Sequence, residues 1–139
     1  MVQRYRMADE NEAHVYGATM ARSDMRPIVA DLQELTAKLG SSVDVVLDFT
    51  GIVSATASYL KRTILWLHDG AKLAAEGKPP APPEDPATPL DIFIFVAGLG
   101  DEVRAELDEL LLQHNRTCLE VSTDVGDVVD KVRILGPLD

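Results

Sequence analysis

The chain has 139 residues, 46% of them hydrophobic, which is the usual size of one globular domain with its own core. Its formal net charge of −10 would repel a nucleic-acid backbone or an anionic membrane, and its basic residues form no long stripe. A single cysteine, Cys118, excludes an internal disulfide, no leader-like segment opens the chain, and no apolar run approaches the roughly 20 residues of a membrane span. We therefore expect one cytoplasmic domain over residues 1–139, with no nucleic-acid partner and no membrane span.

The first 40 residues predict a β-hairpin followed by a helix. Residues 2–7 alternate apolar and polar, 9–12 form a polar turn, and 13–18 are short and strand-like, as in a hairpin. Helical spacing then follows Ser23 or Asp24, either of which can cap a first turn. The helical positions are Pro27 in the first turn, then Ile28, Leu32, Leu35 and Leu39, with Gly40 as the stop.

The middle of the chain predicts a strand, a second helix and a loop. Residues 43–49 are almost all apolar, as in a buried strand. The stripe of the second helix consists of Ala57, Leu60, Ile64, Leu67, Ala71 and Ala74. Residues 76–89 are rich in proline, which continues neither helix nor sheet, so this segment is predicted to be a surface loop.

The last third of the chain continues the alternation of strands and helices. Residues 90–97 are apolar almost without a break, as in an interior strand covered on both faces. A third helical stripe follows over 103–114, then a short strand over 117–121, and a last helix capped by Ser122 or Thr123 and extending to Val132. The whole pattern predicts an α/β domain with a mainly parallel central sheet, an N-terminal β-hairpin and about four helices.

Three segments resemble a known family. They are Asp-Phe-Thr-Gly-Ile at 48–52, Thr-Ala-Ser at 56–58 and the turn over 96–104. Together with the order of elements, these segments resemble the STAS domain of bacterial anti-sigma factor antagonists and related STAS-like proteins. The resemblance covers nearly the whole chain. It implies a non-catalytic, regulatory domain that docks onto a partner protein, often an ATP-binding serine kinase that phosphorylates the domain and thereby ends the interaction.

The resemblance also bears on the phosphoacceptor. In the family pattern an Asp and then the acceptor Ser or Thr stand where this chain has Thr56 and Ala57, and Ser58 stands one residue later. Ser58 and Thr56 are therefore the candidate acceptors in this turn. A helix N-terminus stabilises an anion such as a phosphoryl group through its N–H groups and partial positive charge. The alternative interpretation is that Ser54, Thr56 or Ser58 only caps the helix.

Spacing along the second helix predicts a contact surface. Tyr59, Arg62 and Trp66 recur at three and four residues, which predicts a neighbouring strip on the helix surface, and large aromatics beside Arg are favoured at interfaces. The alternative is that Trp66 closes the edge of the core. The predicted partner-binding residues are Thr56, Ala57, Ser58, Tyr59, Arg62 and Trp66.

A second candidate surface lies at the carboxyl ends of the predicted parallel strands, where open α/β sheets bind ligands. The residues of this ligand edge are Asp48, Thr50, Gly98, Gly100 and Asp101. Gly98-x-Gly100-Asp101 is similar to the start of a dinucleotide-binding turn, but Val103 takes the third glycine position and Asp101 would oppose a pyrophosphate. A simple strand-to-helix turn is favoured.

No combination of residues predicts catalysis or a cofactor. The three histidines are far apart in sequence and have no metal-type spacing with another His or Cys, and no nucleophile with a base can be named from spacing. Cys118 is predicted to be a small buried hydrophobe. We therefore expect a protein-interaction module that is not an enzyme and holds no metal or cofactor. The alternatives are a scaffold or assembly subunit, and a small-ligand-binding domain.

Overall fold

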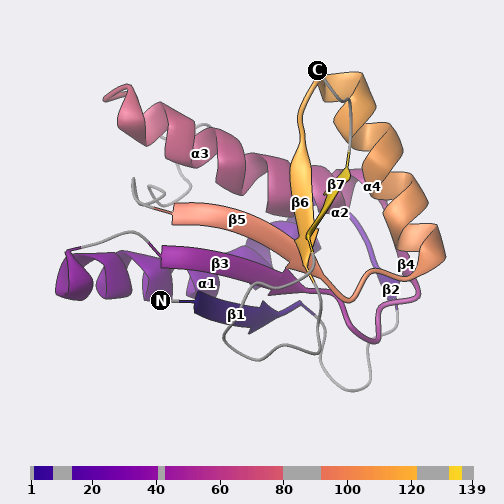
Figure 1. The fold of residues 1–139 in the computed structure, drawn as a ribbon, viewed down its shortest axis with the longest axis horizontal. Coiled ribbons are helices and arrows are strands. Elements are labelled where there is room, and N and C mark those ends of the chain that lie inside the picture. Colours follow the sequence, from indigo (N-terminus) through magenta and orange to yellow (C-terminus); the bar gives the residue numbers. More distant parts are fainter. Residues whose placement is uncertain (1, 8–13, 41–42, 80–91, 122–131, 136–139) are drawn as a thin grey trace.

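The structure, a computed structural model, describes residues 2–7, 14–40, 43–79, 92–121 and 132–135. Five strands form one sheet in the order β1-β3-β5-β6-β7, and β2 and β4 form a second, two-stranded sheet (Figure 1). The strands are β1 (Val2–Arg6), β2 (His14–Val15), β3 (Val43–Asp48), β4 (Ser54–Ala55), β5 (Ile92–Ala97), β6 (Cys118–Val121) and β7 (Val132–Leu135). The helical elements are α1 (Ala18–Leu39), α2 (Ala57–Leu60), η1 (Lys61–Leu65), α3 (Trp66–Ala75) and α4 (Asp101–His114).

The central sheet is mainly parallel, which confirms the predicted α/β class. β1, β3, β5 and β6 run parallel to their neighbours, and only β7 pairs antiparallel, with β6. Leu47 of β3 lies opposite Val96 of β5, and both side chains are completely buried. The two apolar strands are neighbours, and the sheet continues through Leu119 of β6.

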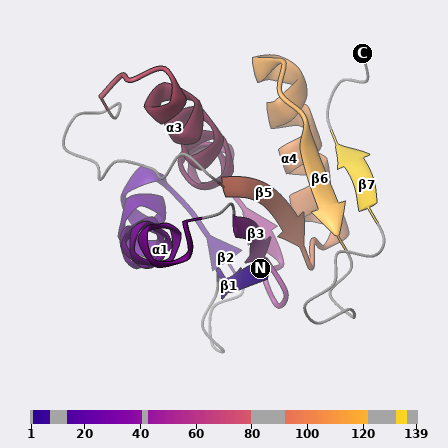
Figure 2. The ribbon, with the colours of Figure 1, turned by 60° about the vertical axis from the view of Figure 1, so that its left-hand side comes forward.

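The helices cover one face of this sheet. Side chains alternate across a strand, so Val43, Val45 and Leu47 pack into the main core, whereas Val46 faces the other side with Ala97 and Val121. In Figure 2, α1, α3 and α4 lie together on one side of the sheet. On the face that bears Val46, the side chain of Phe93 is 60% exposed. The prediction that β5 is covered on both faces is therefore wrong at Phe93, whereas Ala97 on the same face is completely buried.

The predicted N-terminal β-hairpin is also wrong. β1 pairs in parallel with β3, and β2 pairs in parallel with β4, so the two N-terminal strands belong to different sheets. The alternation of residues 2–7 specified a strand but not its neighbour. Pairing with β3 places Tyr5 against the main core, where its hydroxyl donates to Asp31 of α1.

The first helix begins earlier than predicted. It starts at Ala18, after Gly17, and Pro27 lies in its interior instead of its first turn. The added turns bury Ala21, so tertiary packing outweighs the backbone hydrogen bond that Pro27 cannot donate.

The second helix is continuous over residues 57–75 but contains a π turn. In η1 the backbone bonds span five residues, and the N–H of Trp66 donates to the carbonyl of Lys61. Thr63 is completely buried within this turn, and its hydroxyl donates to the carbonyl of Tyr59 at 3.0 Å. That hydroxyl supplies a partner for a backbone oxygen on a widened turn.

Two predicted segments fall mainly outside the described residues. Of the proline-rich loop over 76–89, only 76–79 are described, and these are exposed. Of the predicted last helix only Val132 is described, and it belongs to the strand β7 instead, while the rest of that prediction lies outside the described residues. Within the described part of the chain, the helices are too short or too polar to traverse a bilayer.

Candidate functional site

In the ligand edge predicted from the sequence, the polar groups bind one another and Arg4. Asp48 ends β3, and its Oδ1 accepts hydrogen bonds from the backbone N–H of Thr50 at 2.9 Å and from the Thr50 hydroxyl, while its Oδ2 lies 3.3 Å from Arg4. Gly98 sits directly above this turn with a φ of 69°. A Cβ at Gly98 would lie 2.3 Å from the Thr50 hydroxyl oxygen. Both carboxylate oxygens of Asp48 thus serve the turn and the ion pair with Arg4.

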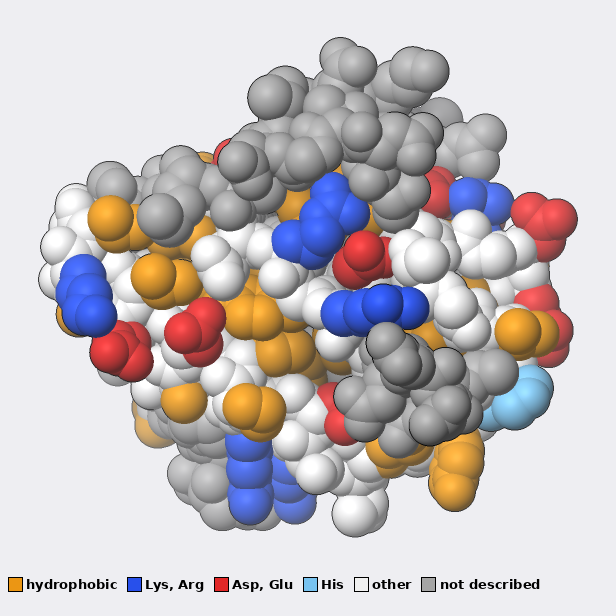
Figure 3. All heavy atoms as spheres, turned by 90° about the horizontal axis from the view of Figure 1, so that it is seen from below, with side chains coloured by type: hydrophobic (Ala, Val, Ile, Leu, Met, Phe, Trp, Pro, Cys, Tyr) orange, Lys and Arg blue, Asp and Glu red, His pale blue; other side chains and the backbone are white. Residues whose placement is uncertain are grey.

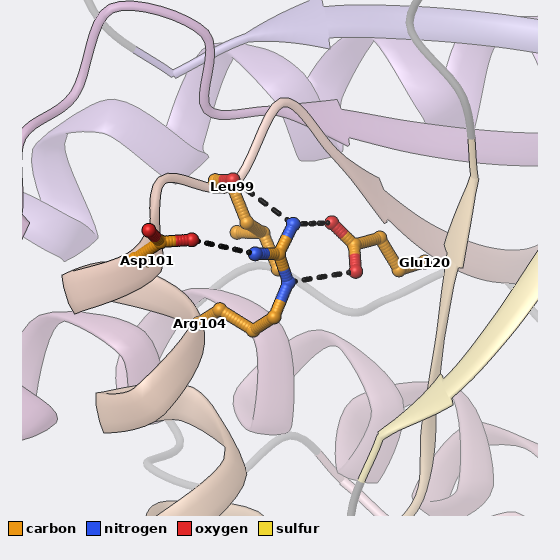
Figure 4. Close-up of polar contacts among 4 residues, drawn as sticks. All are labelled: Leu99, Asp101, Arg104 and Glu120. Atoms are coloured by element: carbon orange, nitrogen blue, oxygen red, sulfur yellow. Dashed lines mark hydrogen bonds and ion pairs between the residues drawn. The ribbon is translucent and has the colours of Figure 1, made fainter.

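The loop after β5 is held by Arg104, a residue to which the sequence analysis assigned no role. Its guanidinium, on α4, donates to both carboxylate oxygens of Glu120 on β6, at 2.7 and 3.0 Å, and also to the carbonyl of Leu99 at 3.1 Å (Figure 4). Asp101, fully exposed in the first turn, lies 3.3 Å from the same group. Gly100 caps α4 with a φ of −76°, which any residue adopts. Gly98, Gly100 and Asp101 therefore form a strand-to-helix turn fastened to β6.

The three hydroxyls before the second helix have different surroundings. Ser54 lies 2.5 Å from Nδ1 of His14 on the paired strand. The hydroxyl oxygen of Thr56 caps the helix by accepting from the N–H of Tyr59 at 3.3 Å, and it also accepts from the N–H of Gly17 at 3.0 Å. Ser58 is exposed and has no hydrogen-bond partner among the described residues. The capping interpretation therefore holds for Thr56, and Ser58 is the exposed hydroxyl of this turn that no described residue engages.

The predicted strip of Tyr59, Arg62 and Trp66 is divided. Tyr59 is completely buried and donates to Asp24 of α1 at 2.8 Å, so the prediction that it is a surface contact is wrong. Residues seven apart lie within about 20° on a regular α-helix. The π turn adds a residue between Tyr59 and Trp66, so it is Leu67, eight residues on, that is buried like Tyr59.

Arg62 and Trp66 instead line a groove, here called the α3–α4 groove. It lies between η1–α3 and the C-terminal end of α4, and its volume is about 530 Å³. Trp66 is half-buried and packs against the main core as well as lining the groove. The helical spacing predicted that Arg62 and Trp66 are neighbours. Residues 114 and 116, on the opposite wall of the groove, are remote in the chain, so the sequence could not predict that they lie near this pair.

Charges elsewhere on the surface are mixed. The side of the molecule on which β1 and α1 lie carries basic and acidic side chains interspersed among hydrophobic ones (Figure 3). Among the described residues, no three His, Cys, Asp or Glu side chains are grouped closely enough to hold a metal ion.

We expect Cys118 to be unreactive in the folded protein. It is 2% exposed at the start of β6, and burial raises the pKa of its thiol to about 12, whereas an ordinary thiol has a pKa of about 8.5. At pH 8, dithiobis-nitrobenzoate should react with less than roughly 1% of the folded protein in the time needed for complete reaction in urea. The chain has one cysteine, so the absorbance of the released thionitrobenzoate measures the reaction of this residue alone. Complete reaction of folded protein would show that β6 opens readily.

Comparisons with protein-family models, curated proteins and solved structures found no match for this chain.

Proposed function

We propose that this chain is a cytoplasmic, non-catalytic regulatory module that binds another protein through the loop after β3 and the first turn of α2. The observation that carries the proposal is Ser58, an exposed hydroxyl without a partner in the described residues, at the start of a helix whose other nearby hydroxyls are engaged. Val53 and Ala57 beside it are exposed, with Val53 55% exposed. An apolar and hydroxyl-bearing edge on a rigid strand–helix junction is suited to docking.

The support of this edge is rigid. Thr56 joins the start of α2 to the start of α1 through Gly17, and the backbone N–H of Thr56 donates to Val15 at 3.2 Å. Ile52, between the turn and β4, is buried in the main core. Ser58 is thus presented at a defined position, so little conformational entropy would be lost when a partner binds.

The resemblance to STAS domains suggests the class of partner. An ATP-binding serine kinase, or another regulatory or assembly component, fits a domain whose candidate acceptor is Ser58, the second residue of the helix. A phosphoryl group there would be favoured by the N-terminal end of the helix, so the fold would tolerate it. The same charge would oppose docking through repulsion and desolvation. Thr56 is the weaker acceptor because its oxygen is used in two hydrogen bonds.

The substitution Ser58→Asp should weaken partner binding by roughly tenfold, which is about 1.4 kcal/mol. The melting temperature should stay within about 2 °C of wild type, because an acid in the first turn suits the helix dipole. The measurement is recovery of each identified partner from extracts of the native cell, quantified by mass spectrometry for wild type and variant.

Ala30→Asp is the matched control. Residue 30 is exposed on α1, about 20 Å along the helix from the end that adjoins Thr56, and the change adds a negative charge at an exposed position. Equal recovery of every partner by wild type and Ser58→Asp would reject this docking edge. Mass spectrometry of the protein from its native cell also reports whether Ser58 or Thr56 carries phosphate.

An assembly subunit is the second candidate function, and the exposed Phe93 favours it. Phe93 lies on the sheet face opposite the helices, and a large aromatic that is 60% exposed is a common anchor at interfaces. The same recovery assay tests this candidate. If Phe93→Ser loses partners while Ser58→Asp recovers them as wild type does, assembly through the sheet face is favoured.

A further inference from the structure

The α3–α4 groove concentrates positive charge in a chain that is acidic overall. Among the described residues, five Lys and Arg residues line it, against two Asp and Glu residues. The basic residues are Lys61, Arg62, Lys72, Lys78 and Arg116, and the acidic residues are Asp69 and Glu76. The lining therefore carries a net charge of the opposite sign to the −10 of the whole chain. A local field of this kind attracts an acidic partner that the rest of the surface repels.

Both acidic residues of the groove are already paired with basic ones. Asp69 lies 3.2 Å from Arg116, and Glu76 lies 2.8 Å from Lys78. No described carboxylate forms an ion pair with Lys61 or Lys72, although both line the groove, and Lys72 acts on Glu76 only through its charge. Ammonium groups outside an ion pair leave room for carboxylates supplied from outside.

A π turn shapes this wall. η1 contributes Lys61, Arg62 and Leu65 to the groove, and Trp66 follows it directly. π turns are rare, well under 1% of residues, and frequently occur at functional sites. In this helix the turn leaves Trp66 half-buried at the groove while Tyr59 stays in the core. The wide turn therefore brings an aromatic side chain and two cations to the same wall.

The shape of the groove indicates an elongated occupant. Its lining residues recur along the helix from Lys61 to Glu76, a rise of about 22 Å at 1.5 Å per residue. Apolar contacts come from Leu65, Trp66 and Leu73, and the charged groups lie along the same wall. A compact ligand would touch only part of this length, whereas an amphipathic helix of about four turns would span it.

We propose that the α3–α4 groove binds an acidic amphipathic segment of a partner protein, with its apolar stripe against Leu65, Trp66 and Leu73 and its carboxylates on Lys61 and Lys72. This proposal rests on the proposed function only in that the chain acts by binding a protein. It adds a second contact region, which begins three residues after Ser58 and continues along η1 and α3, and it specifies the chemistry of the partner.

The test captures the occupant and then reverses the charges. A photoreactive benzoylphenylalanine replaces Leu73 in the groove or Val53 at the Ser58 edge, and each full-length variant is irradiated in the native cell. Mass spectrometry identifies the captured protein and the segment joined to residue 73. A synthetic peptide of that segment is then titrated with purified wild type, with Lys61→Glu/Lys72→Glu, and with Arg26→Glu/Lys38→Glu, which changes the charge equally on exposed positions of α1.

The proposal predicts that the captured segment is acidic with an apolar helical stripe. Lys61→Glu/Lys72→Glu should weaken binding of the peptide at least about tenfold, Arg26→Glu/Lys38→Glu less than twofold, and a peptide with Lys in place of its acidic residues should bind the groove variant better than wild type. Affinity for wild type should fall as salt rises from 0.05 to 0.5 M, since these charges are solvent-accessible. Circular dichroism of each variant shows that it is folded.

The contrary outcomes separate the two proposals. Capture at residue 53 but not at residue 73, or capture at residue 73 of a neutral or basic segment or of nucleic acid, overturns the groove proposal and leaves the docking edge at Ser58 intact. Capture at residue 73 alone, with the expected charge reversal, supports the groove and rejects the Ser58 edge. Capture of no protein at either position overturns both.

Discussion

Replacing Gly98 with alanine should lower the free energy of unfolding by about 3 kcal/mol, with a fall in melting temperature of roughly 10 °C. The backbone of Gly98 is left-handed, with a φ of 69°, which costs a residue with a Cβ about 1–2 kcal/mol. The added Cβ would also lie 2.3 Å from the Thr50 hydroxyl and 2.7 Å from both Asp48 Oδ1 and the Thr50 N–H nitrogen. All three of these atoms belong to the Asp48–Thr50 turn backbone or its hydrogen bonds, so they cannot move without breaking the turn.

Gly40→Ala separates the two causes. Gly40 ends α1 with a φ of 63°, but a Cβ there would meet no heavy atom within 4 Å. Its cost should be about 1 kcal/mol, from backbone conformation alone. Urea unfolding followed by circular dichroism measures both variants. If Gly98→Ala and Gly40→Ala cost the same, β5 does not close over the turn as tightly as the structure shows.

Arg104→Met should lower the free energy of unfolding by about 2–3 kcal/mol. The Glu120 side chain is only 11% exposed, and both of its oxygens accept from Arg104. Removing the guanidinium leaves the carboxylate charge without a partner in a nearly dry site and also leaves the Leu99 carbonyl without the Arg104 donor. The effect should be seen as a lower urea midpoint with an unchanged slope.

Two further variants show whether the buried charge is responsible. Arg104→Met combined with Glu120→Leu should recover more than half of the lost stability, because no charge remains in the site. Arg116→Met should cost less than about 1 kcal/mol, because the ion pair of Arg116 with Asp69 is more than 40% exposed on both sides. Failure of the double variant to recover would mean that packing of the Arg104 stem, and not the charge of Glu120, holds the loop.

These two residues link stability to the proposed docking edge. Gly98 allows the β5–α4 loop to lie against the turn that follows β3, and Arg104 fastens the same loop to β6. α2 begins shortly after that turn. A partner that docks at Ser58 would therefore meet a surface whose backbone is held from two directions, which suits recognition by shape with little rearrangement.

The sequence by itself determined the secondary structure that depends on local periodicity. Apolar runs over 43–48 and 92–97 specify strands, and the three- and four-residue spacing over 103–114 specifies a helix, because each segment must bury one face or both. The same patterns predicted the parallel pairing of β3 with β5, since a helix between two strands returns the chain in the same direction. They also predicted that Cys118 is buried.

Only the tertiary structure decided which distant groups meet. The alternation in β1 is compatible with a hairpin, and its pairing with β3 depends on how Tyr5 packs against α1. The local pattern does not specify the π turn, which sets Tyr59 in the core and half-buried Trp66 at the groove while the second helix packs against α1 and β5. Arg104 pairs with Glu120, 16 positions away, and Lys61 lines the same groove as Arg116, 55 positions away. Local patterns record which face of an element is apolar, but the partner of a charge, and the space left between two helices, depend on the whole chain at once.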